Sequence, residues 1–518
     1  MDALAHGRGR RRSTLDVIGA GPRTLAGVLE ALGVEYLLQP ASRYLEEPHP
    51  QGFDLLLVSA MSGDLPTAAR VVKRWKREQG GPAVLGGPAA SDPWGALRRT
   101  GVDVAVVGEG EYALSELVDS GLDPTEVRGA AYWEEGEVRL NPLRPVQPPT
   151  VFSEYPPSTK AVTKYPLYRS ARVYVEVVRG CSNYHRARLD PGGCAGCERC
   201  TQGRLEERYT CPRGIPPGCG YCSVPSLHGP PRSRGVELVV GESEELLGLG
   251  VRRLVLSAPG FLDYMRERLV HPHPLTDPRS PEPNYQALEE LLSSLTSLPR
   301  VEAGEASVMV ENLKPSLVTP RAAELLGKYL AGTPVSIGLE TGCPHHSRAI
   351  GRPNTPEEAL QAVRLLKAAG LRPYVYVIHG LPGQTRETSR KTEEAIEKSA
   401  HAGAERVILY RFQSLPASAF SGQPSGPPST RDEDSKAIAQ AAERINREAR
   451  RGLVGQRIWV VAAERYRGDP ERWVAYPLKH GPVVLVGGAL REGALVQVRV
   501  TGLLGRRMVC AQPLTPKK

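Results

Sequence analysis

Cysteine is concentrated in one short stretch of this chain, where neighbouring thiols could hold a metal ion or an iron–sulfur cluster. The sequence contains nine cysteines, and seven of them lie between positions 181 and 222. Disulfides are rare in a reducing cytosol, so this clustering favours metal or cluster binding. The seven candidate ligands are Cys181, Cys194, Cys197, Cys200, Cys211, Cys219 and Cys222.

Spacing divides these thiols into a group of three and a group of four. Cys219 and Cys222 stand in Gly-Cys-Gly-Tyr-Cys (218–222), where glycine lets the backbone approach a metal centre. Their third partner is either Cys181, which follows an expected strand over 172–178, or Cys211. Both choices stay open on spacing alone, and the cysteine that is not used belongs to the second group.

The group of four lies in the insert 182–218, around the run Cys194-x2-Cys197-x2-Cys200. This run is similar to the cysteine pattern that binds an iron–sulfur cluster in ferredoxins. Four-cysteine zinc sites also use Cys-x2-Cys spacing. An auxiliary iron–sulfur cluster and a zinc ion therefore both remain open for the insert.

The elements expected around the cysteines place them at the carboxyl ends of parallel strands. Before them, short apolar runs alternate with amphipathic helices, which is typical of a doubly wound α/β domain. A second βα series surrounds them and predicts a full or partial β/α barrel, with its chemistry at the strand ends. Short strands with glycine turns follow and are typical of a small β-barrel. In this α/β chain the predicted segments are a basic disordered tail (1–13), the first domain (14–140), a linker (141–170), the second domain (171–415), a linker with a helix (416–452) and the β-barrel (453–514).

Residues 172–415 resemble the radical SAM superfamily, whose usual pattern is Cys-x3-Cys-x2-Cys after the first barrel strand. Cys219, Tyr221 and Cys222 match the end of this pattern, whereas the insert separates them from Cys181. The resemblance favours Cys181 over Cys211 as the first ligand, because residues 176–181 (Glu-Val-Val-Arg-Gly-Cys) are similar to the family's first strand and ligand. The resemblance implies a [4Fe–4S] cluster held by three cysteines. It also implies that S-adenosylmethionine (SAM) binds the open iron and is cleaved to a 5′-deoxyadenosyl radical, with an electron donor such as ferredoxin or flavodoxin.

Two further segments resemble the superfamily and suggest where SAM binds. Gly241 and Glu242 lie where the family often contacts the methionine amine. Glu340 and Thr341, within Gly-Leu-Glu-Thr-Gly (338–342), resemble a strand end near the bound nucleoside. These four residues are the expected SAM contacts, and the sequence identifies no side chain that donates a proton or a hydrogen atom.

The two outer domains carry resemblances of their own. Residues 86–88 (Gly-Gly-Pro) and 108–111 (Gly-Glu-Gly-Glu) are similar to the cobalamin-binding-type domain that precedes many radical SAM domains, but the Asp-x-His-x-x-Gly motif is absent. A bound cobalamin and a bare structural domain both stay open. The last domain resembles the TRAM barrel, an RNA-binding module of tRNA methylthiotransferases. Its candidate phosphate contacts are Arg457, Arg465, Arg467, Arg472, Lys479, Arg499, Arg506 and Arg507.

Charge and hydropathy favour a nucleic-acid partner over a membrane. Lys and Arg exceed Asp and Glu by 66 − 57 = 9, which favours a polyanion such as RNA. No run of 18 apolar residues is present, so we expect a cytoplasmic protein without a membrane span. The leading hypothesis is a radical SAM transferase that modifies RNA, with tRNA as the expected substrate, by methylation, methylthiolation or a related C–H functionalisation. The alternatives are the same chemistry on a peptide, protein or small metabolite, and a non-catalytic RNA-binding iron–sulfur protein.

Overall fold

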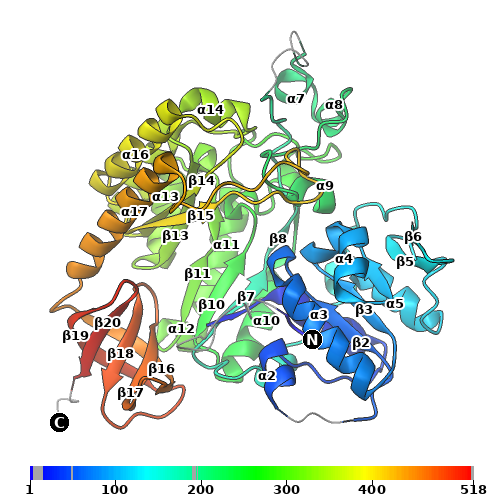
Figure 1. The fold of residues 1–518 in the computed structure, drawn as a ribbon. Helices are drawn as coiled ribbons and strands as arrows, with labels where there is room; N and C mark the ends of the chain where they lie inside the picture. The colour runs from blue at the N-terminus through cyan, green and yellow to red at the C-terminus, as the bar shows by residue number, and fades with distance from the viewer. Residues whose placement is uncertain (4–15, 48–50, 190–193, 195–196, 515–518) are drawn as a thin grey trace. The chain divides into compact units, whose positions relative to one another are not determined.

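The chain forms two compact units, Met1–Tyr168 and Arg169–Lys518 (Figure 1). The computed structural model describes residues 1–3, 16–47, 51–189, 194 and 197–514. Within these ranges, no helix has both the length and the apolar character needed to cross a membrane.

The first unit is built on a five-stranded sheet in the order β2-β3-β4-β5-β6, in which β2, β3 and β4 are parallel. Apolar side chains of α3 and α4 pack on one face of this sheet, and those of α1 and α5 pack on the other. This arrangement confirms the predicted doubly wound α/β fold. The elements are β1 (Val17–Ile18), α1 (Ala20–Ala31), α2 (Ala41–Glu46), β2 (Leu56–Ser59), α3 (Leu65–Glu78), β3 (Ala83–Gly86), α4 (Pro93–Thr100), β4 (Val104–Val106), α5 (Glu111–Asp119), β5 (Ala130–Glu134) and β6 (Glu137–Leu140).

The first three residues belong to this sheet, although the sequence assigns them to a disordered tail. Ala3 N donates a hydrogen bond to Ser59 O (2.9 Å), and Ser59 N donates to Met1 O (2.9 Å). On its other side, Asp2 N donates to Gln39 O (2.9 Å). Backbone pairing with β2 thus orders this segment, while the rest of the predicted tail lies outside the described residues.

The segment predicted as a proline-rich linker packs onto the first unit. It contains α6 (Val151–Glu154) and a 3-10 helix, η3 (Lys160–Lys164), with buried apolar residues in both. A Cβ atom on Gly27 of α1 would lie 1.9 Å from Pro156 O, so only glycine allows this close approach. The apolar side chains between the prolines make this stretch part of the domain, which the composition did not reveal.

The second unit begins with a partial β/α barrel of parallel strands in the orders β7-β10-β11 and β12-β13-β14-β15. Glu311 joins the two groups, because its N–H donates to Leu256 O (3.3 Å) and its carbonyl accepts from Ser336 N (3.0 Å). Short elements around the cysteines are β8 (Val178–Arg179), α7 (Arg199–Gln202), α8 (Leu205–Tyr209), α9 (Val224–His228) and β9 (Arg232–Ser233). The barrel strands are β7 (Arg172–Glu176), β10 (Arg253–Ser257), β11 (Ser307–Val310), β12 (Asn312–Leu313), β13 (Pro334–Glu340), β14 (Arg372–His379) and β15 (Arg406–Arg411).

Helices cover the outer face of these strands, as the fold class predicts (Figure 1). Outward-facing Val173, Val175, Leu254 and Leu256 are completely buried. Side chains alternate along a strand, so the other face, called the inner face below, carries Tyr174, Glu176, Ser257, Ser336, Gly338, Tyr374, Tyr376, Ile378, Ile408 and Tyr410. The helices are α10 (Val236–Gly248), α11 (Tyr285–Thr296), α12 (Pro299–Glu302), α13 (Pro320–Leu330), α14 (Pro344–Ala349), α15 (Pro356–Ala368), α16 (Arg386–His401) and α17 (Glu433–Arg451).

A closed barrel in the order β16-β17-β18-β20-β19 ends the second unit and agrees with the predicted small β-barrel. Its core consists of valine and alanine side chains. Tyr374 Oη lies 2.8 Å from His480 Nδ1, and Lys479 Nζ donates to Ala331 O (3.1 Å), so the barrel is anchored to the β/α part. Its strands are β16 (Arg457–Tyr466), β17 (Asp469–Pro477), β18 (Val483–Gly487), β19 (Leu495–Leu504) and β20 (Met508–Pro513).

Candidate active site

Three cysteines converge at the carboxyl end of the first barrel strand. Asn183 links two of them, because its backbone N–H donates to Cys181 Sγ (3.5 Å) and its Nδ2 donates to Cys219 Sγ (3.3 Å). Cys222 N donates to Cys219 O (2.8 Å) in a tight turn. Glycine at 220 is required in this turn, since a Cβ atom there would lie 2.4 Å from the ring of Phe420. The structure therefore brings Cys181, and not Cys211, together with the 219–222 pair.

Burial controls the charge of these thiols. It raises the pKa of Cys222 to about 12, and the neighbouring Cys219 and Cys181 raise it too. Burial also raises the pKa of Cys181. Without a bound cation these two groups are thiols, whereas iron binding would favour their thiolates. Three sulfur donors that converge beside N–H donors fit the three-cysteine ligation of a [4Fe–4S] cluster.

Arg352 lies beside this cysteine group and joins it to Glu340. Its NH1 donates to Tyr221 Oη (3.2 Å) and lies 3.8 Å from Cys219 Sγ and 3.7 Å from Glu340 Oε1. Glu340 is buried and has φ 63°, in the left-handed region that non-glycine residues rarely adopt. A register shift between Gly338 and Glu340 accompanies this conformation, as is common near active sites. The bulge turns this expected SAM contact toward the cysteines.

Sequence reasoning missed Arg352. It lies 133 positions from Cys219, and no spacing pattern connects the two. Its neighbour Gly351 has φ 76° and a backbone that packs against Gly218 O, where a Cβ atom would lie at 2.8 Å. The sequence signal for Arg352 was its place directly after a glycine that follows a short helix. That signal does not show which residues Arg352 contacts, whereas the fold does.

A buried charged network lies behind Cys181 and was also missed. Arg266 NH1 donates to Asp263 Oδ1 (2.6 Å), and neither side chain is exposed. Lys314 pairs with the same carboxylate and donates from Nζ to Ser182 Oγ (2.7 Å). Burial opposes ionisation of Asp263, but Lys314 and Arg266 outweigh it and lower the pKa of this carboxyl. The network fixes Ser182, next to a candidate ligand, at the end of β8.

The other expected SAM contacts have internal partners. Glu242 accepts a hydrogen bond from Arg234 NH1 (2.6 Å), and both side chains are almost completely buried. Arg234 NH1 also donates to Glu176 O (2.9 Å), which ties α10 to the end of β7. Thr341 Oγ1 lies 3.2 Å from His346 Nδ1 and belongs to a buried group of polar side chains. Gly241 stands on α10 with open space at its Cα.

The four other cysteines of the insert lie near two of its arginines. Arg188 NH2 donates to Cys200 Sγ (3.2 Å). Hydrogen bonding to Cys200 raises the pKa of Arg188, and the nearby Cys194 and Cys197 raise it as well. Burial lowers the pKa of Arg186, while Cys200 and Cys211 raise it, so these two thiols lie close to its guanidinium. Within the described ranges, no group of three or more Cys, His, Asp or Glu side chains is spaced for a single metal ion, and this holds for Cys181, Cys219 and Cys222 as well as for the insert. In a [4Fe–4S] cluster each cysteine binds a different iron.

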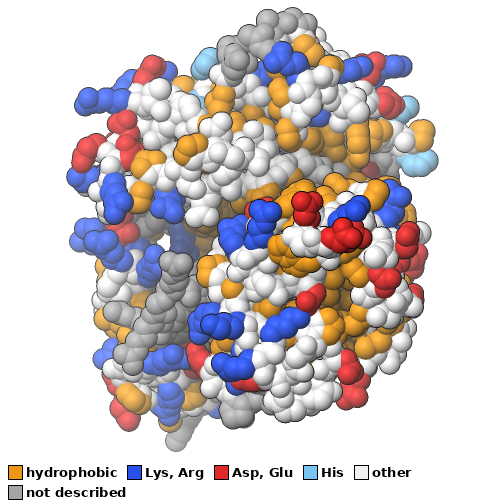
Figure 2. Space-filling model, turned by 45° about the vertical axis from the view of Figure 1, so that its right-hand side comes forward, with side chains coloured by type: hydrophobic (Ala, Val, Ile, Leu, Met, Phe, Trp, Pro, Cys, Tyr) orange, Lys and Arg blue, Asp and Glu red, His pale blue; other side chains and the backbone are white. Residues whose placement is uncertain are grey.

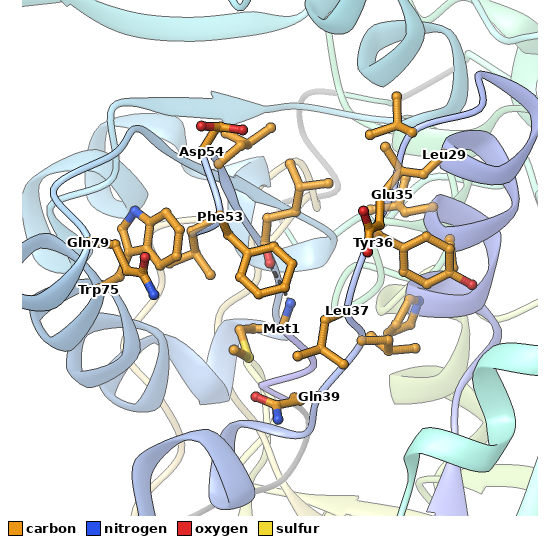
Figure 3. Close-up of a pocket in the computed structure, with 18 of the residues that line it drawn as sticks. Met1, Leu29, Glu35, Tyr36, Leu37, Gln39, Phe53, Asp54, Trp75 and Gln79 are labelled. Atoms are coloured by element: carbon orange, nitrogen blue, oxygen red, sulfur yellow. Dashed lines mark hydrogen bonds between the residues drawn. The ribbon is translucent and has the colours of Figure 1, made fainter. Parts of the chain in front are cut away.

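The first unit contains a separate cavity of about 680 Å³, lined mainly by α1, β2 and the segments 34–39 and 51–55 (Figure 3). Phe53, Tyr36 and Leu37 border it, and Gln39 lies at its lower edge in this view. In the part of the chain that the structure describes, Gln39 Oε1 is buried without a hydrogen-bond partner. A buried acceptor in an apolar cavity fits a ligand with a polar edge, and the domain thus has room for part of a large cofactor such as cobalamin.

Comparisons with known proteins agree with this architecture. Residues 209–396 match the Radical SAM superfamily and residues 11–118 match the B12 binding domain. The chain is 42% identical over 515 residues to an uncharacterized protein of Methanopyrus kandleri, covering 98% of this chain and 94% of the relative. It is 38% identical to an uncharacterized protein of Methanocaldococcus jannaschii, with 96% and 95% covered.

More distant relatives have named activities. The ribosomal protein uS12 methylthiotransferase RimO of Syntrophobacter fumaroxidans is 24% identical over 58% of this chain and 64% of its own length. A tRNA-2-methylthio-N(6)-dimethylallyladenosine synthase of Lawsonia intracellularis is 25% identical over 48% and 46%. The radical SAM methyltransferase TsrM of Kitasatospora setae shares the fold, with a TM-score of 0.55 and 16% identity over 78% of this chain and 74% of TsrM.

Proposed function

Because the chain belongs to the radical SAM superfamily and carries a B12 binding domain, we propose that it modifies RNA, with tRNA as the expected substrate. The transferred group would be a methyl group, a methylthio group or a related substituent on carbon. The radical SAM domain implies a [4Fe–4S] cluster and SAM, and cobalamin-bound structures of similar fold support cobalamin as a further cofactor. The relationship to methylthiotransferases and methyltransferases supports a transferase.

The proposed cluster ligands are Cys181, Cys219 and Cys222. A cluster held by these three cysteines would supply the electron for reductive cleavage of SAM. Asn183 would stabilise two ligand thiolates through its N–H groups, and Arg352 would offset the negative charge at Cys219. A second centre, iron–sulfur or zinc, would use the four cysteines of the insert. A reduced ferredoxin or flavodoxin remains the expected electron donor.

The observation that carries the RNA proposal is a pair of arginines on the C-terminal barrel. Arg457 of β16 is directly opposite Arg499 of β19, and both side chains are exposed. Like charges in this position destabilise a sheet, and a phosphate bound between them would relieve the repulsion. Toward the other end of β16, Arg465 lies over the ring of Trp473, 4.6 Å from its centroid. Arginine with aromatic side chains on a small closed barrel is typical of nucleic-acid-binding modules.

The chain has more Lys and Arg than Asp and Glu, but the positive side chains do not form one patch on the face that Figure 2 shows. Lys and Arg side chains are spread over this face with Asp and Glu side chains between them. A local arginine pair is therefore a better guide to an RNA contact than the net charge of +9. Any binding through Arg457 and Arg499 should be electrostatic, and so it should weaken as salt rises.

The proposal can be tested by measuring the affinity of the full chain for total tRNA across a salt series. Replacing Arg457 and Arg499 with alanine should reduce the slope of log K against log salt by about 0.7–0.9 for each phosphate that is no longer neutralised. Arg364→Ala, on the exposed side of α15, is the matched control and should leave the slope unchanged. An unchanged slope in the double variant would count against the barrel as the RNA-binding surface.

The product is identified by comparing the modified nucleosides of tRNA from cells with and without the gene, using mass spectrometry. Loss of a modified nucleoside would support the proposal. An unchanged nucleoside profile, together with a changed mass of a ribosomal protein, would instead favour a protein substrate. The named activity of the Syntrophobacter relative makes this the second candidate.

A further inference from the structure

The inner face of the partial barrel carries two stacked tyrosine rings that take no part in the proposed cluster ligation. Tyr376 of β14 and Tyr410 of β15 are parallel, with an interplanar angle of 2° and centroids 5.6 Å apart. The β14–β15 register pairs Tyr376 with Ile408 and Ile378 with Tyr410, so the two rings are diagonal neighbours on one face. The Tyr410 side chain is 53% exposed despite its size. An open ring supported by a second ring is a surface on which another flat ring can stack.

The rings lie close to the cysteine group. Gly338 is the β13 residue paired with Tyr376, so no side chain from that strand position covers the ring. A Cβ atom on Gly338 would lie 2.7 Å from both Arg352 and Glu340. Glycine thus leaves space for the two residues that connect the inner face with Cys219.

A carboxyl group lies on the same face of the sheet as the rings. Glu311 accepts a hydrogen bond from Ser257 Oγ (3.0 Å), and Ser257 is a residue of the inner face. Further acceptor sites remain on this carboxyl group. Burial raises the pKa of Tyr410 to about 12, and the charges of Tyr376, Glu340 and Glu311 raise it further. Glu311 can therefore pair with an N–H group at the edge of a ring stacked on Tyr410.

We propose that Tyr376 and Tyr410 form a platform on which one base of the RNA substrate stacks, while Glu311 pairs with an amino or imino group on its edge. This inference rests on the proposed RNA substrate and identifies the part of it that enters the barrel. Adenine, guanine and cytosine each carry an exocyclic amino group that a carboxyl can accept. An unpaired base that leaves its stack can be held in this way, by an aromatic face and by its edge.

The test compares Tyr410→Leu with Tyr410→Phe in the full chain, using total tRNA as the probe. Phenylalanine keeps the stacking face and should retain the wild-type affinity. Leucine removes it and should weaken binding about 5- to 150-fold, the range for losing one base–aromatic stack. Because every phosphate remains neutralised, the weakening should be the same at every salt concentration, unlike that of the barrel arginine variants.

Two further measurements make the result decisive. The affinity for SAM should be the same in both variants, and a loss that parallels the loss of tRNA binding would assign the rings to the adenine of SAM and overturn the proposal. If the wild-type chain binds tRNA and Tyr410→Leu binds it equally well, the platform is wrong while the RNA proposal stands. If the wild-type chain binds no tRNA, the RNA proposal fails and this inference fails with it.

Discussion

Asp263 pairs with two buried cations, Arg266 and Lys314, behind Cys181, and replacing it with asparagine should destabilise the second unit strongly. Asparagine has nearly the same shape but no charge, so the change isolates electrostatics from packing. Arg266 is fully buried and Lys314 is 9% exposed, so neither cation can turn into water without a rearrangement. Removing one partner from such a buried group typically costs about 3–5 kcal/mol, because the remaining charges stay desolvated and unpaired.

The measurement is urea unfolding of the full chain at neutral pH, followed by a probe in the second unit such as Trp459 or Trp473 fluorescence. Glu289→Gln is the matched control, since Glu289 pairs with Lys328 on the surface, where the two side chains are 50% and 59% exposed. An exposed pair of this kind contributes about 0–1 kcal/mol. If Asp263→Asn costs no more than Glu289→Gln, the reasoning from burial is refuted.

The same network predicts a pH dependence with a defined sign. The pKa of Asp263 is lowered in the folded chain relative to its ordinary value of 3.8. The carboxylate therefore contributes its full stability above that ordinary value and loses it as pH falls through the lowered folded value. The difference in unfolding free energy between wild type and Asp263→Asn should be constant from pH 7 down to about 4 and should shrink below it. A difference that shrinks between pH 7 and 5 would contradict this assignment.

The other predictions concern the cysteines and one close contact. Replacing either cysteine of the 219–222 pair with alanine should abolish cleavage of SAM; normal cleavage in either variant would exclude it as a ligand. Cys181→Ala should behave in the same way, whereas Cys211→Ala should retain some cleavage, which the yield of 5′-deoxyadenosine measures. Anaerobically reconstituted protein should contain roughly seven to eight iron atoms if both groups bind clusters, and about four with one zinc if the insert binds zinc. Gly27→Ala should lower the stability of the first unit by at least about 1–3 kcal/mol, because backbone must move to admit the methyl group; a melting curve equal to that of wild type would rule out the close contact.

Much of the fold could be predicted because its signals are local. Apolar runs between amphipathic helices gave the doubly wound domain and the partial barrel, and strand–turn periodicity gave the terminal barrel. The linker over 141–170 was misread because its prolines dominate the composition, while the few apolar side chains that pack on the first unit, such as Phe152, form no periodic pattern. Composition does not encode which surface a short apolar segment meets.

The site was predictable in its sulfur atoms and in Glu340. Cysteine spacing singled out the candidate ligands, and the family resemblance favoured Cys181 over Cys211 and suggested Glu340. Arg352 and Lys314 could not be found in this way, since each reaches the site from a different βα unit of the barrel. The sequence separation between a strand end and its neighbours in space is set by helix and loop lengths, which vary freely, so no fixed spacing exists to recognise.

The arginines beside both cysteine groups indicate that these thiols are built to carry negative charge. Arg186 is 3% exposed, and it donates hydrogen bonds to the carbonyls of Tyr184, Arg208, Tyr209 and Ile215, with Cys211 as a further hydrogen-bond partner. Carbonyls solvate a guanidinium but do not neutralise it, and a buried charge without a counter-charge is costly. The thiols of Cys200 and Cys211 lie close to this guanidinium and would neutralise it as thiolates. Neutral thiols would leave the charge of Arg186 uncompensated, whereas metal-bound thiolates would balance it. Ligation of a metal by these cysteines would therefore account for a buried arginine in the insert.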